Sequence, residues 1–250
     1  LKLLTDYLKT LNINEIVMFV DAYDIVFLKG HDEIEKEFLS YNKDIVFGGL
    51  CGENSYLEKK ITKLIFSKDI EFPEQKTCFK ALNAGCYIGY VGSILDILTG
   101  ICGENDCENK KLDDQKIISE YFIKNHKEKN LGIDYNTQIV YNFESTSDFN
   151  YLLNHIIRLF NYQTIDFGTE NKLFKLDQHD KFLVKQNNTY PCVIHAHGYT
   201  NIDSIVKKLG LPPKIKSKNY EYGYKTFINT KLVDIIEYRQ SRKWYVSIAV

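Results

Sequence analysis

The chain has 250 residues, 44% of them apolar and 26% charged, with a formal net charge of -1, as expected of one globular domain with a sizeable core. This balance argues against a nucleic-acid-binding protein, because a surface that follows phosphates usually carries an excess of lysine and arginine. No stretch reaches the roughly 20 apolar residues of a membrane-spanning helix, and no secretory signal is visible. Because the first residue is leucine, we expect a trimmed or processed piece.

The first 51 residues alternate helical and strand patterns. Leucines at three- and four-residue spacing predict an amphipathic helix over residues 1–11, and the apolar run Ile16–Val20 predicts a buried strand. Asp32 and Glu35 occupy capping-box positions for a helix over residues 32–41, and "DIVFGGL" is typical of a second buried strand. Such alternation predicts an α/β fold, with a mostly parallel sheet covered by helices on both faces.

The remaining chain continues this alternation. The predicted helices are "SYLEKKITKLIF", "SILDILTGI", "LDDQKIISEYFIK" and "SIVKKLG", and the predicted strands are "NAGCYIGYV", "TQIVYNF" and "CVIHAHG". No internal repeat or flexible linker separates these segments. We therefore expect one domain over residues 1–250, in which residues 206–250 have no assigned role.

Six cysteines show no Cys-x-x-Cys pair and no spacing typical of zinc ligands, which argues against a metal site built from them. Cys102 and Cys107 flank a polar loop and are candidates for a bridge, but free or buried thiols are the favoured expectation. Asn187 begins a glycosylation sequon, which matters only in a secretory compartment.

Two aspartates interrupt the apolar stretch "INEIVMFVDAYDIVFLKG". Asp21 and Asp24 follow the predicted strand directly, and the carboxyl ends of strands are where open α/β sheets bind ligands. Carboxylates at this position suit Mg²⁺ or Mn²⁺. The alternative is a solvated surface turn.

Two further segments carry groups suited to the same chemistry. His195 and His197 point to the same face of a strand, where they either complete a metal site or make hydrogen bonds within the fold. An Asp, Asp and His set suits Mn²⁺ better than Mg²⁺, because imidazole is the softer ligand. Asp113 and Asp114 open a predicted helix, where capping explains one acid; since successive helical residues diverge by about 100°, the other can face a cleft.

Small and polar residues also interrupt the apolar strand "LNAGCYIGYV". Asn83, Gly85 and Gly89 mark either a β-bulge or a place where a ligand or another backbone comes close. The residues alone leave both interpretations open.

Taken in order, "FVDAYD", "LNAGCYIGYV", "LDDQ", "IDYNTQIVYNF" and "VIHAHG" closely resemble the glycosyltransferase domain of procollagen lysyl hydroxylases over roughly residues 1–205. The resemblance implies a GT-A-like fold, with Asp21, Asp24 and His195 as Mn²⁺ ligands and Tyr23 in contact with the nucleotide. A composition rich in Lys, Asn, Ile and Tyr is typical of an AT-rich genome and suggests a stand-alone giant-virus relative.

The same resemblance assigns the remaining site residues. Asp113 and Asp114 match the catalytic acidic run of the family. Asp134, Gln138 and Asn142 lie on a matching strand with a partly structural role. The residues expected around the sugar and the diphosphate are Asn83, Gly85, His197 and Gly198.

The sequence departs from the family pattern at four places. The first strand of the family, with its nucleotide-binding turn, is expected before residue 1, and no tryptophan follows "DIVFGGLCGE". Asn201 stands where a basic residue is expected. The "QHD" at residues 178–180 lacks the His-x-Asp spacing of an iron site, so lysyl hydroxylation is not predicted.

The resemblance implies a Mn²⁺-dependent, retaining transfer of glucose from UDP-glucose to galactosylhydroxylysine in collagen or a collagen-like protein. Transfer of galactose from UDP-galactose to hydroxylysine is one alternative, and a catalytically silent module that binds collagen or nucleotide sugar is another. The expected compartment is the endoplasmic reticulum lumen for a cellular protein, and the infected host cell or virion for a viral one. A homodimer is compatible with the sequence.

Overall fold

The computed structural model describes residues 1–21, 25–51, 72–73, 76–104, 113–143, 166, 168–196 and 201–211. It also describes the backbone of four short strands near the carboxyl end, β10 (Ile215–Lys216), β11 (Tyr222–Gly223), β12 (Lys225–Ile228) and β13 (Lys231–Asp234). The expected helix over "SYLEKKITKLIF" lies outside the described residues.

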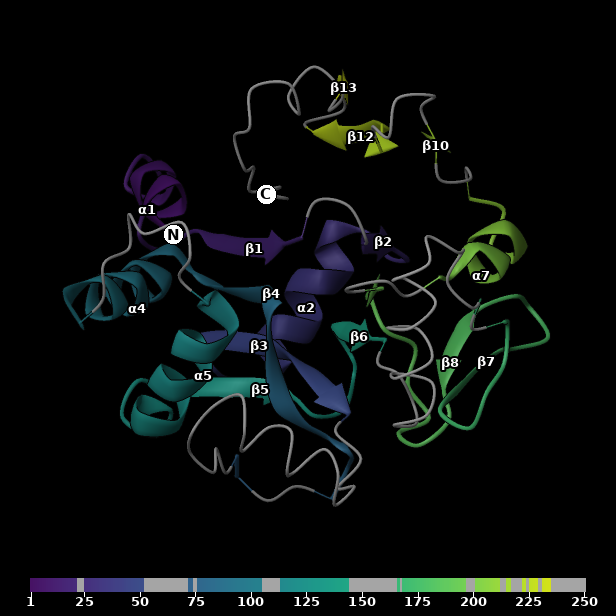
Figure 1. Cartoon of the computed structure of the whole chain (residues 1–250), viewed down its shortest axis with the longest axis horizontal. Helices are drawn as coiled ribbons and strands as arrows, with labels where there is room; N and C mark the ends of the chain where they lie inside the picture. The colour runs from purple at the N-terminus through teal and green to yellow at the C-terminus, as the bar shows by residue number, and fades with distance from the viewer. Residues whose placement is uncertain are drawn as a thin grey trace, which may run out of the picture.

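A four-stranded sheet in the order β1-β4-β3-β5 forms the centre of the fold (Figure 1). Its strands are β1 (Ile16–Val20), β4 (Phe79–Tyr90), β3 (Ile45–Cys51) and β5 (Leu131–Asp134). Because β4 is antiparallel to β1 and β3 while β3 is parallel to β5, the strands β1, β3 and β5 all point the same way. The expected α/β class is confirmed, whereas the reversed β4 was not predicted, since strand direction depends on the connections between strands.

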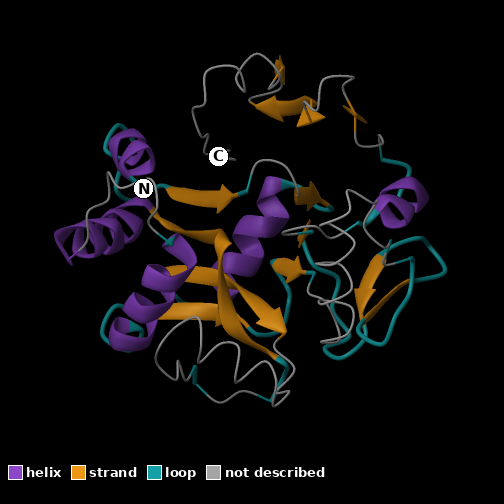
Figure 2. Ribbon diagram, viewed as in Figure 1, coloured by secondary structure: helices purple, strands orange, loops and turns teal. Residues whose placement is uncertain are grey.

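Helices cover both faces of this sheet, as expected (Figures 1 and 2). They are α1 (Lys2–Leu8), α4 (Val91–Glu104) and α5 (Asp114–Asn125) on one face and α2 (His31–Ser40) on the other. Alternate side chains of β1 point to opposite faces of the sheet. Val17 packs with α1, α4 and α5, whereas Met18 and Val20 pack with α2. Within the part of the chain that is described, no helix is long and apolar enough to cross a membrane.

A second sheet adjoins the first in the order β2-β9-β6. Its strands are β2 (Ile25–Phe27), β9 (Val193–His195) and β6 (Val140–Asn142). An aromatic cluster joins it to the hairpin β7–β8 (Phe174–Leu176 and Phe182–Val184) and to α7 (Asp203–Lys208). The carboxyl ends of β1 and β9 therefore lie on adjoining sheets.

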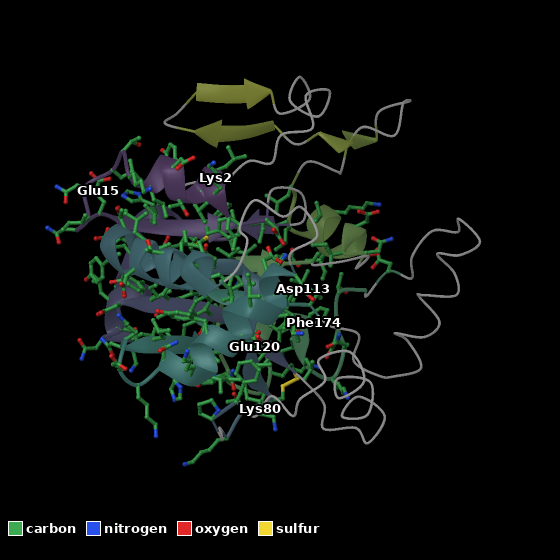
Figure 3. The ribbon with its side chains drawn as sticks, turned by 60° about the vertical axis from the view of Figure 1, so that its left-hand side comes forward. Lys2, Glu15, Lys80, Asp113, Glu120 and Phe174 are labelled. Carbon is green, nitrogen blue, oxygen red and sulfur yellow. A yellow bond between two sulfur atoms is a disulfide. The ribbon has the colours of Figure 1, made fainter. Side chains whose placement is uncertain are left out.

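Cys51 and Cys78 form a disulfide that joins the end of β3 to the residue before β4, and Figure 3 shows it near Lys80. Cys102 is disulfide-bonded as well, whereas Cys86 and Cys192 are buried thiols outside any disulfide. The expectation of thiols throughout was therefore wrong for three described cysteines. Sequence spacing gave no sign of the first pairing, because the sheet brings together residues that lie 27 positions apart.

Asp134 ends β5 inside a buried hydrogen-bond cluster. Its side chain is fully buried and accepts hydrogen bonds from the Tyr41 hydroxyl and from the backbone N–H groups of Gln138, Ile139 and Val140. Burial raises the pKa of the Asp134 carboxyl, and these four hydrogen bonds act in the opposite direction. The cluster fixes the turn between β5 and β6, which agrees with the partly structural role expected for this segment.

Candidate active site

The site begins where β1 ends. The backbone N–H of Asp21 donates to the carbonyl oxygen of Gly85 on β4 at 2.8 Å, so this aspartate is fixed at the carboxyl end of its strand. Its side chain is about half exposed, at 52%. The backbone at Asp21 is therefore held in place, and its carboxylate is open to a ligand.

β4 bulges at this point. Phe47 of β3 pairs with Tyr87, but the next residue, Gly48, pairs with Asn83, so residues 84–86 form a bulged loop of β4 on the side that faces β3. The side-chain oxygen of Asn83 accepts from the Gly85 N–H at 2.8 Å and stabilises that loop. The expected bulge is confirmed, and Asn83 has a structural partner within it; its contact with a sugar stays a prediction.

Gly85 lies where any side chain would collide with the site. A Cβ at this position would sit 2.3 Å from Oδ2 of Asp21 and 3.0 Å from Cε1 of His195. Only glycine lets the strand approach both groups this closely. A β-bulge and a close approach to other groups were the two interpretations of this glycine pattern. Both hold, because the bulge brings Gly85 close to Asp21 and His195.

His195 is the last residue of β9 and is fully buried. Its Nε2 atom lies 3.5 Å from Oδ2 of Asp21, and its Nδ1 atom lies 2.7 Å from Oδ1 of Asn142 at the end of β6. In the antiparallel pair of β2 and β9, His195 is opposite Ile25. Residues that are distant in sequence, at positions 21, 25, 85, 142 and 195, therefore converge here.

Two of the three expected metal ligands are described, and they fit one ion. Ligands bonded to an octahedral cation at about 2.1 Å lie roughly 3.0 Å apart in adjacent positions and 4.2 Å apart in opposite ones. The 3.5 Å between Asp21 and His195 lies between these two values, so one cation can reach both atoms in a distorted geometry. The described residues include no group of three metal-ligating side chains. Asp24 lies outside the described residues, as do Tyr23, His197 and Gly198.

Asp113 and Asp114 lie at the start of α5, where Figure 3 labels Asp113, and they differ in their partners. Asp113 is the N-cap, and its carboxylate accepts from the N–H of Lys116 at 3.1 Å. Asp114 accepts from the adjacent N–H of Gln115 at 2.8 Å. Its pKa is raised, first by partial burial and then by the carboxylates of Asp21 and Asp113. As expected, one acid caps the helix; the other is within electrostatic reach of Asp21.

Gln115 anchors this helix to the bulge, a role that its sequence position did not reveal. Its side-chain oxygen accepts from the N–H of Ala84 at 2.8 Å, and its side-chain nitrogen donates to the carbonyl of Leu82 at 2.9 Å. The amide thus pairs with β4 as a neighbouring strand would. Since it follows Asp114 directly, it fixes the start of α5 beside the metal-ligand candidates.

Tyr87 is a second residue that sequence reasoning missed. It is buried, and its ring stacks on Phe19 with 4.9 Å between centroids. Burial raises its pKa most, followed by the negative charges of Asp114 and Asp21. The negative charges of Asp21 and Asp114 both act on Tyr87, which is consistent with a site that is rich in negative charge.

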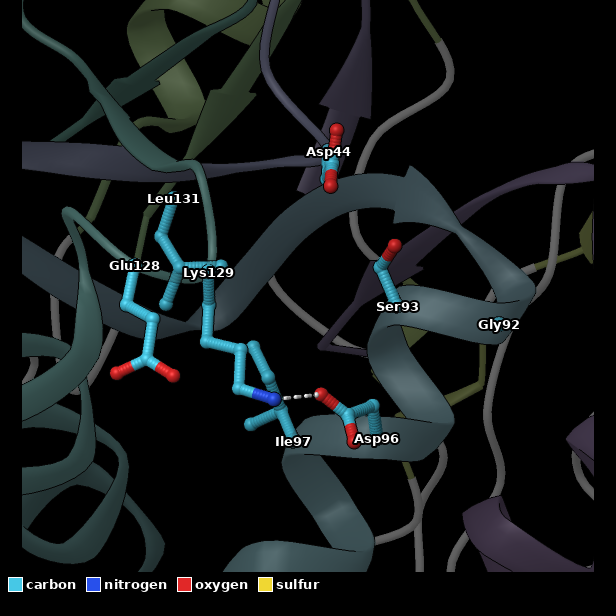
Figure 4. A pocket seen from close by; sticks show the side chains of 8 residues that line it. All are labelled: Asp44, Gly92, Ser93, Asp96, Ile97, Glu128, Lys129 and Leu131. Carbon is cyan, nitrogen blue, oxygen red and sulfur yellow. Dashed lines mark hydrogen bonds and ion pairs between the residues drawn. The ribbon is translucent and has the colours of Figure 1, made fainter.

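A cavity of about 240 Å³ lies at the opposite end of the central sheet, where α4 begins (Figure 4). Its lining includes Asp44, Ser93 and Glu128, and an ion pair joins Lys129 to Asp96 at 2.7 Å. None of the expected site residues lines it. The carboxyl end of β1, as the position of Asp21 predicts, remains the candidate active site.

Comparison with known proteins identifies the family of this domain. The family model for the PLOD GT domain matches residues 1–163. Procollagen-lysine,2-oxoglutarate 5-dioxygenase 1 of Mus musculus is 23% identical over 188 residues, which cover 75% of this chain and 21% of the mouse protein. The corresponding Drosophila melanogaster enzyme is 23% identical over 192 residues, covering 75% of this chain and 22% of that protein.

A viral protein is also similar. Uncharacterized protein R699 of Acanthamoeba polyphaga mimivirus is 26% identical over 162 residues, which cover 63% of this chain and 30% of the viral protein. The match to this chain therefore spans about a fifth of the animal proteins and under a third of the viral one. Because the family model covers most of the chain and includes Asp21, Gly85 and the Asp113–Asp114 pair, the chain belongs to the PLOD GT domain family of glycosyltransferase domains.

Proposed function

We propose that this glycosyltransferase transfers glucose from UDP-glucose to galactosylhydroxylysine in a collagen-like chain, with Mn²⁺ and with retention of the anomeric configuration. The observation that carries the proposal is the convergence of Asp21 and His195, 3.5 Å apart, against a glycine that leaves room for both. A buried imidazole beside an accessible carboxylate is a donor set that suits Mn²⁺.

Asp21 and His195 would hold the cation together with Asp24. Asp24 is next in sequence to Ile25, and Ile25 is the residue that pairs with His195. The bound ion would supply positive charge next to the diphosphate, which gains negative charge as the bond to glucose breaks. Fixed ligands make this stabilisation effective, because they need not reorganise during the reaction.

Asp114 is the better of the two acids for a role at the anomeric carbon. Each acid accepts one backbone hydrogen bond, Asp113 from the Lys116 N–H that it caps and Asp114 from the adjacent Gln115 N–H, but partial burial and the charge of Asp21 raise the pKa of Asp114. A carboxylate beside the sugar would either attack the anomeric carbon or stabilise its oxocarbenium-like charge, as in glycoside hydrolysis. Both routes need Asp114 ionised.

Two further observations support the proposed acceptor and compartment. Animal proteins that match this chain are named for procollagen lysine, which supports a hydroxylysine-bearing acceptor. The Cys51–Cys78 disulfide supports an oxidising compartment such as the endoplasmic reticulum lumen, since reducing compartments keep thiols free.

The direct test is release of UDP from UDP-glucose, with and without Mn²⁺ and with three peptides that carry galactosylhydroxylysine, hydroxylysine or lysine. We expect turnover only with metal and the galactosylated peptide. Turnover of UDP-galactose on the hydroxylysine peptide would instead assign galactose transfer. Binding of UDP-glucose without turnover on any peptide would refute catalysis and leave a binding module.

A further inference from the structure

A hydrogen-bond chain runs from the backbone of β3 to the buried imidazole. The side-chain nitrogen of Asn142 donates to the carbonyl oxygen of Gly49 at 3.0 Å, and the side-chain oxygen faces Nδ1 of His195 at 2.7 Å. Asn142 is 1% exposed and His195 is 0% exposed, so exchange with bulk water does not compete with these contacts.

This chain determines which atom of the imidazole carries the proton. The carbonyl of Gly49 can only accept, so the Asn142 atom that faces it must be the NH₂ group. The other amide atom is then an oxygen, which also can only accept. His195 must therefore donate from Nδ1, and its neutral ring carries the lone pair on Nε2, the atom that faces Asp21.

We infer that Asn142 is a positioning residue that holds His195 in the tautomer able to bind a divalent cation through Nε2. This inference rests on the proposed function, because it gives His195 the role of a metal ligand. A partner on the second ring nitrogen orients a ligating histidine and raises its basicity.

Neighbouring backbone keeps the Asn142 amide in this orientation. Asn142 and His195 are directly paired in the parallel register of β6 and β9. On the opposite side, a Cβ at Gly48 would sit 2.7 Å from the Asn142 nitrogen, so glycine is needed for this side chain to reach Gly49. The amide is thus held between two strands.

The tautomer is measurable without metal and without substrate. In ¹⁵N-labelled protein at a pH where the ring is neutral, two-bond nitrogen–proton couplings identify the protonated nitrogen of His195, assigned by the signals lost in His195→Gln. We expect the proton on Nδ1 in the parent. A proton on Nε2 would overturn the inference, whatever the activity of the enzyme.

Variants at position 142 extend the test. Asn142→Leu keeps the size but cannot accept a hydrogen bond, so we expect a mixture of tautomers and Mn²⁺ affinity about 10- to 100-fold weaker by calorimetry. Asn142→Asp retains an acceptor and should restore the Nδ1 tautomer. An unchanged tautomer and unchanged Mn²⁺ affinity in Asn142→Leu would overturn the inference.

Asn187→Leu is the matched control. Asn187 also donates through its side-chain amide, to the carbonyl of Tyr135 at 3.2 Å, but it lies outside the site. Its replacement should change neither the tautomer nor Mn²⁺ affinity. If the parent shows the Nδ1 tautomer yet binds no Mn²⁺, the proposed metal-dependent function fails while the assignment of the hydrogen bonds stands.

Discussion

Two groups of carboxylates near the central sheet, Asp134 alone and Asp21 with Asp114, differ in how their negative charge is compensated. Asp134 is completely buried, and four donors of the protein point at its two oxygens. Asp21 and Asp114 are accessible, and each raises the local negative charge that the other experiences. In the first group the protein supplies the compensation; in the second it leaves oxygens available to a cation or a substrate.

The difference separates a structural role from a chemical one. A buried carboxylate with four donors stabilises a turn, and the cost of its desolvation is offset by those bonds. Accessible carboxylates close to one another are unfavourable for folding alone, and such arrangements are typical of functional sites. Replacements in the two groups should therefore affect different measurements.

The largest expected effect is on turnover, from Asp114→Asn. We expect a loss of about 10³-fold in kcat, equivalent to roughly 4 kcal/mol, because the amide has no charge to offer the anomeric carbon. The free energy of unfolding should stay equal or rise slightly. The raised pKa of Asp114 means that its ionised form costs stability at neutral pH, and the amide removes that cost. An active Asp114→Asn enzyme would contradict the assignment of this residue to the chemistry.

Asp134→Ala should show the reverse pattern. It leaves the Tyr41 hydroxyl and three backbone N–H groups without their acceptor, which we expect to lower the free energy of unfolding by about 3–5 kcal/mol. Urea denaturation of parent and variant measures this. At a temperature where the variant remains folded, its Mn²⁺ affinity should match the parent. A loss of Mn²⁺ binding in the folded variant would contradict a purely structural role for Asp134.

Gly85→Ala tests the space between Asp21 and His195. A methyl group 2.3 Å from the Asp21 oxygen must displace that carboxylate, and we expect Mn²⁺ affinity to fall by about 10²-fold, or roughly 2.7 kcal/mol. Gly103→Ala is the control, because a Cβ there meets nothing within 4 Å. Equal Mn²⁺ affinity in both variants, by calorimetry, would show that the close approach at Gly85 has no bearing on metal binding.

The candidate site was more predictable from the sequence than the buried hydrogen-bond cluster around Asp134. Asp21 was identifiable because an apolar strand leads straight into it, and one capping acid was expected at Asp113–Asp114. The anchoring by Gln115 was not, since a polar residue in a first helical turn has many possible partners and its contact with β4 depends on how α5 packs. The donors around Asp134 are largely backbone groups of a turn, which carry no sequence signal.

Tyr41→Phe is a smaller change within the structural cluster, and its effect should depend on pH. At pH 7 we expect a loss of about 1.5–3 kcal/mol, since the hydroxyl donates to a carboxylate. Burial and Asp134 raise the pKa of Tyr41 in the folded protein. Above pH of about 10 the unfolded parent loses this proton while the folded parent keeps it, so the difference between parent and variant should narrow by roughly 1.4 kcal/mol per pH unit. A difference that stays constant up to pH 11 would contradict the burial of this hydroxyl.

The smallest effects are expected from replacements of Asp113, which test whether its role differs from that of Asp114. Asp113→Ala removes the bond from the Lys116 N–H and should lower the free energy of unfolding by about 1 kcal/mol, while Asp113→Ser retains a capping oxygen and should restore most of it. Because capping holds the first turn of α5 in place, the alanine variant should lose less than about 10-fold in kcat. The serine variant should be close to the parent. If Asp113→Ser instead lost as much activity as Asp114→Asn, then the carboxylate of Asp113 would itself act on the sugar, and its bond to the helix would be incidental.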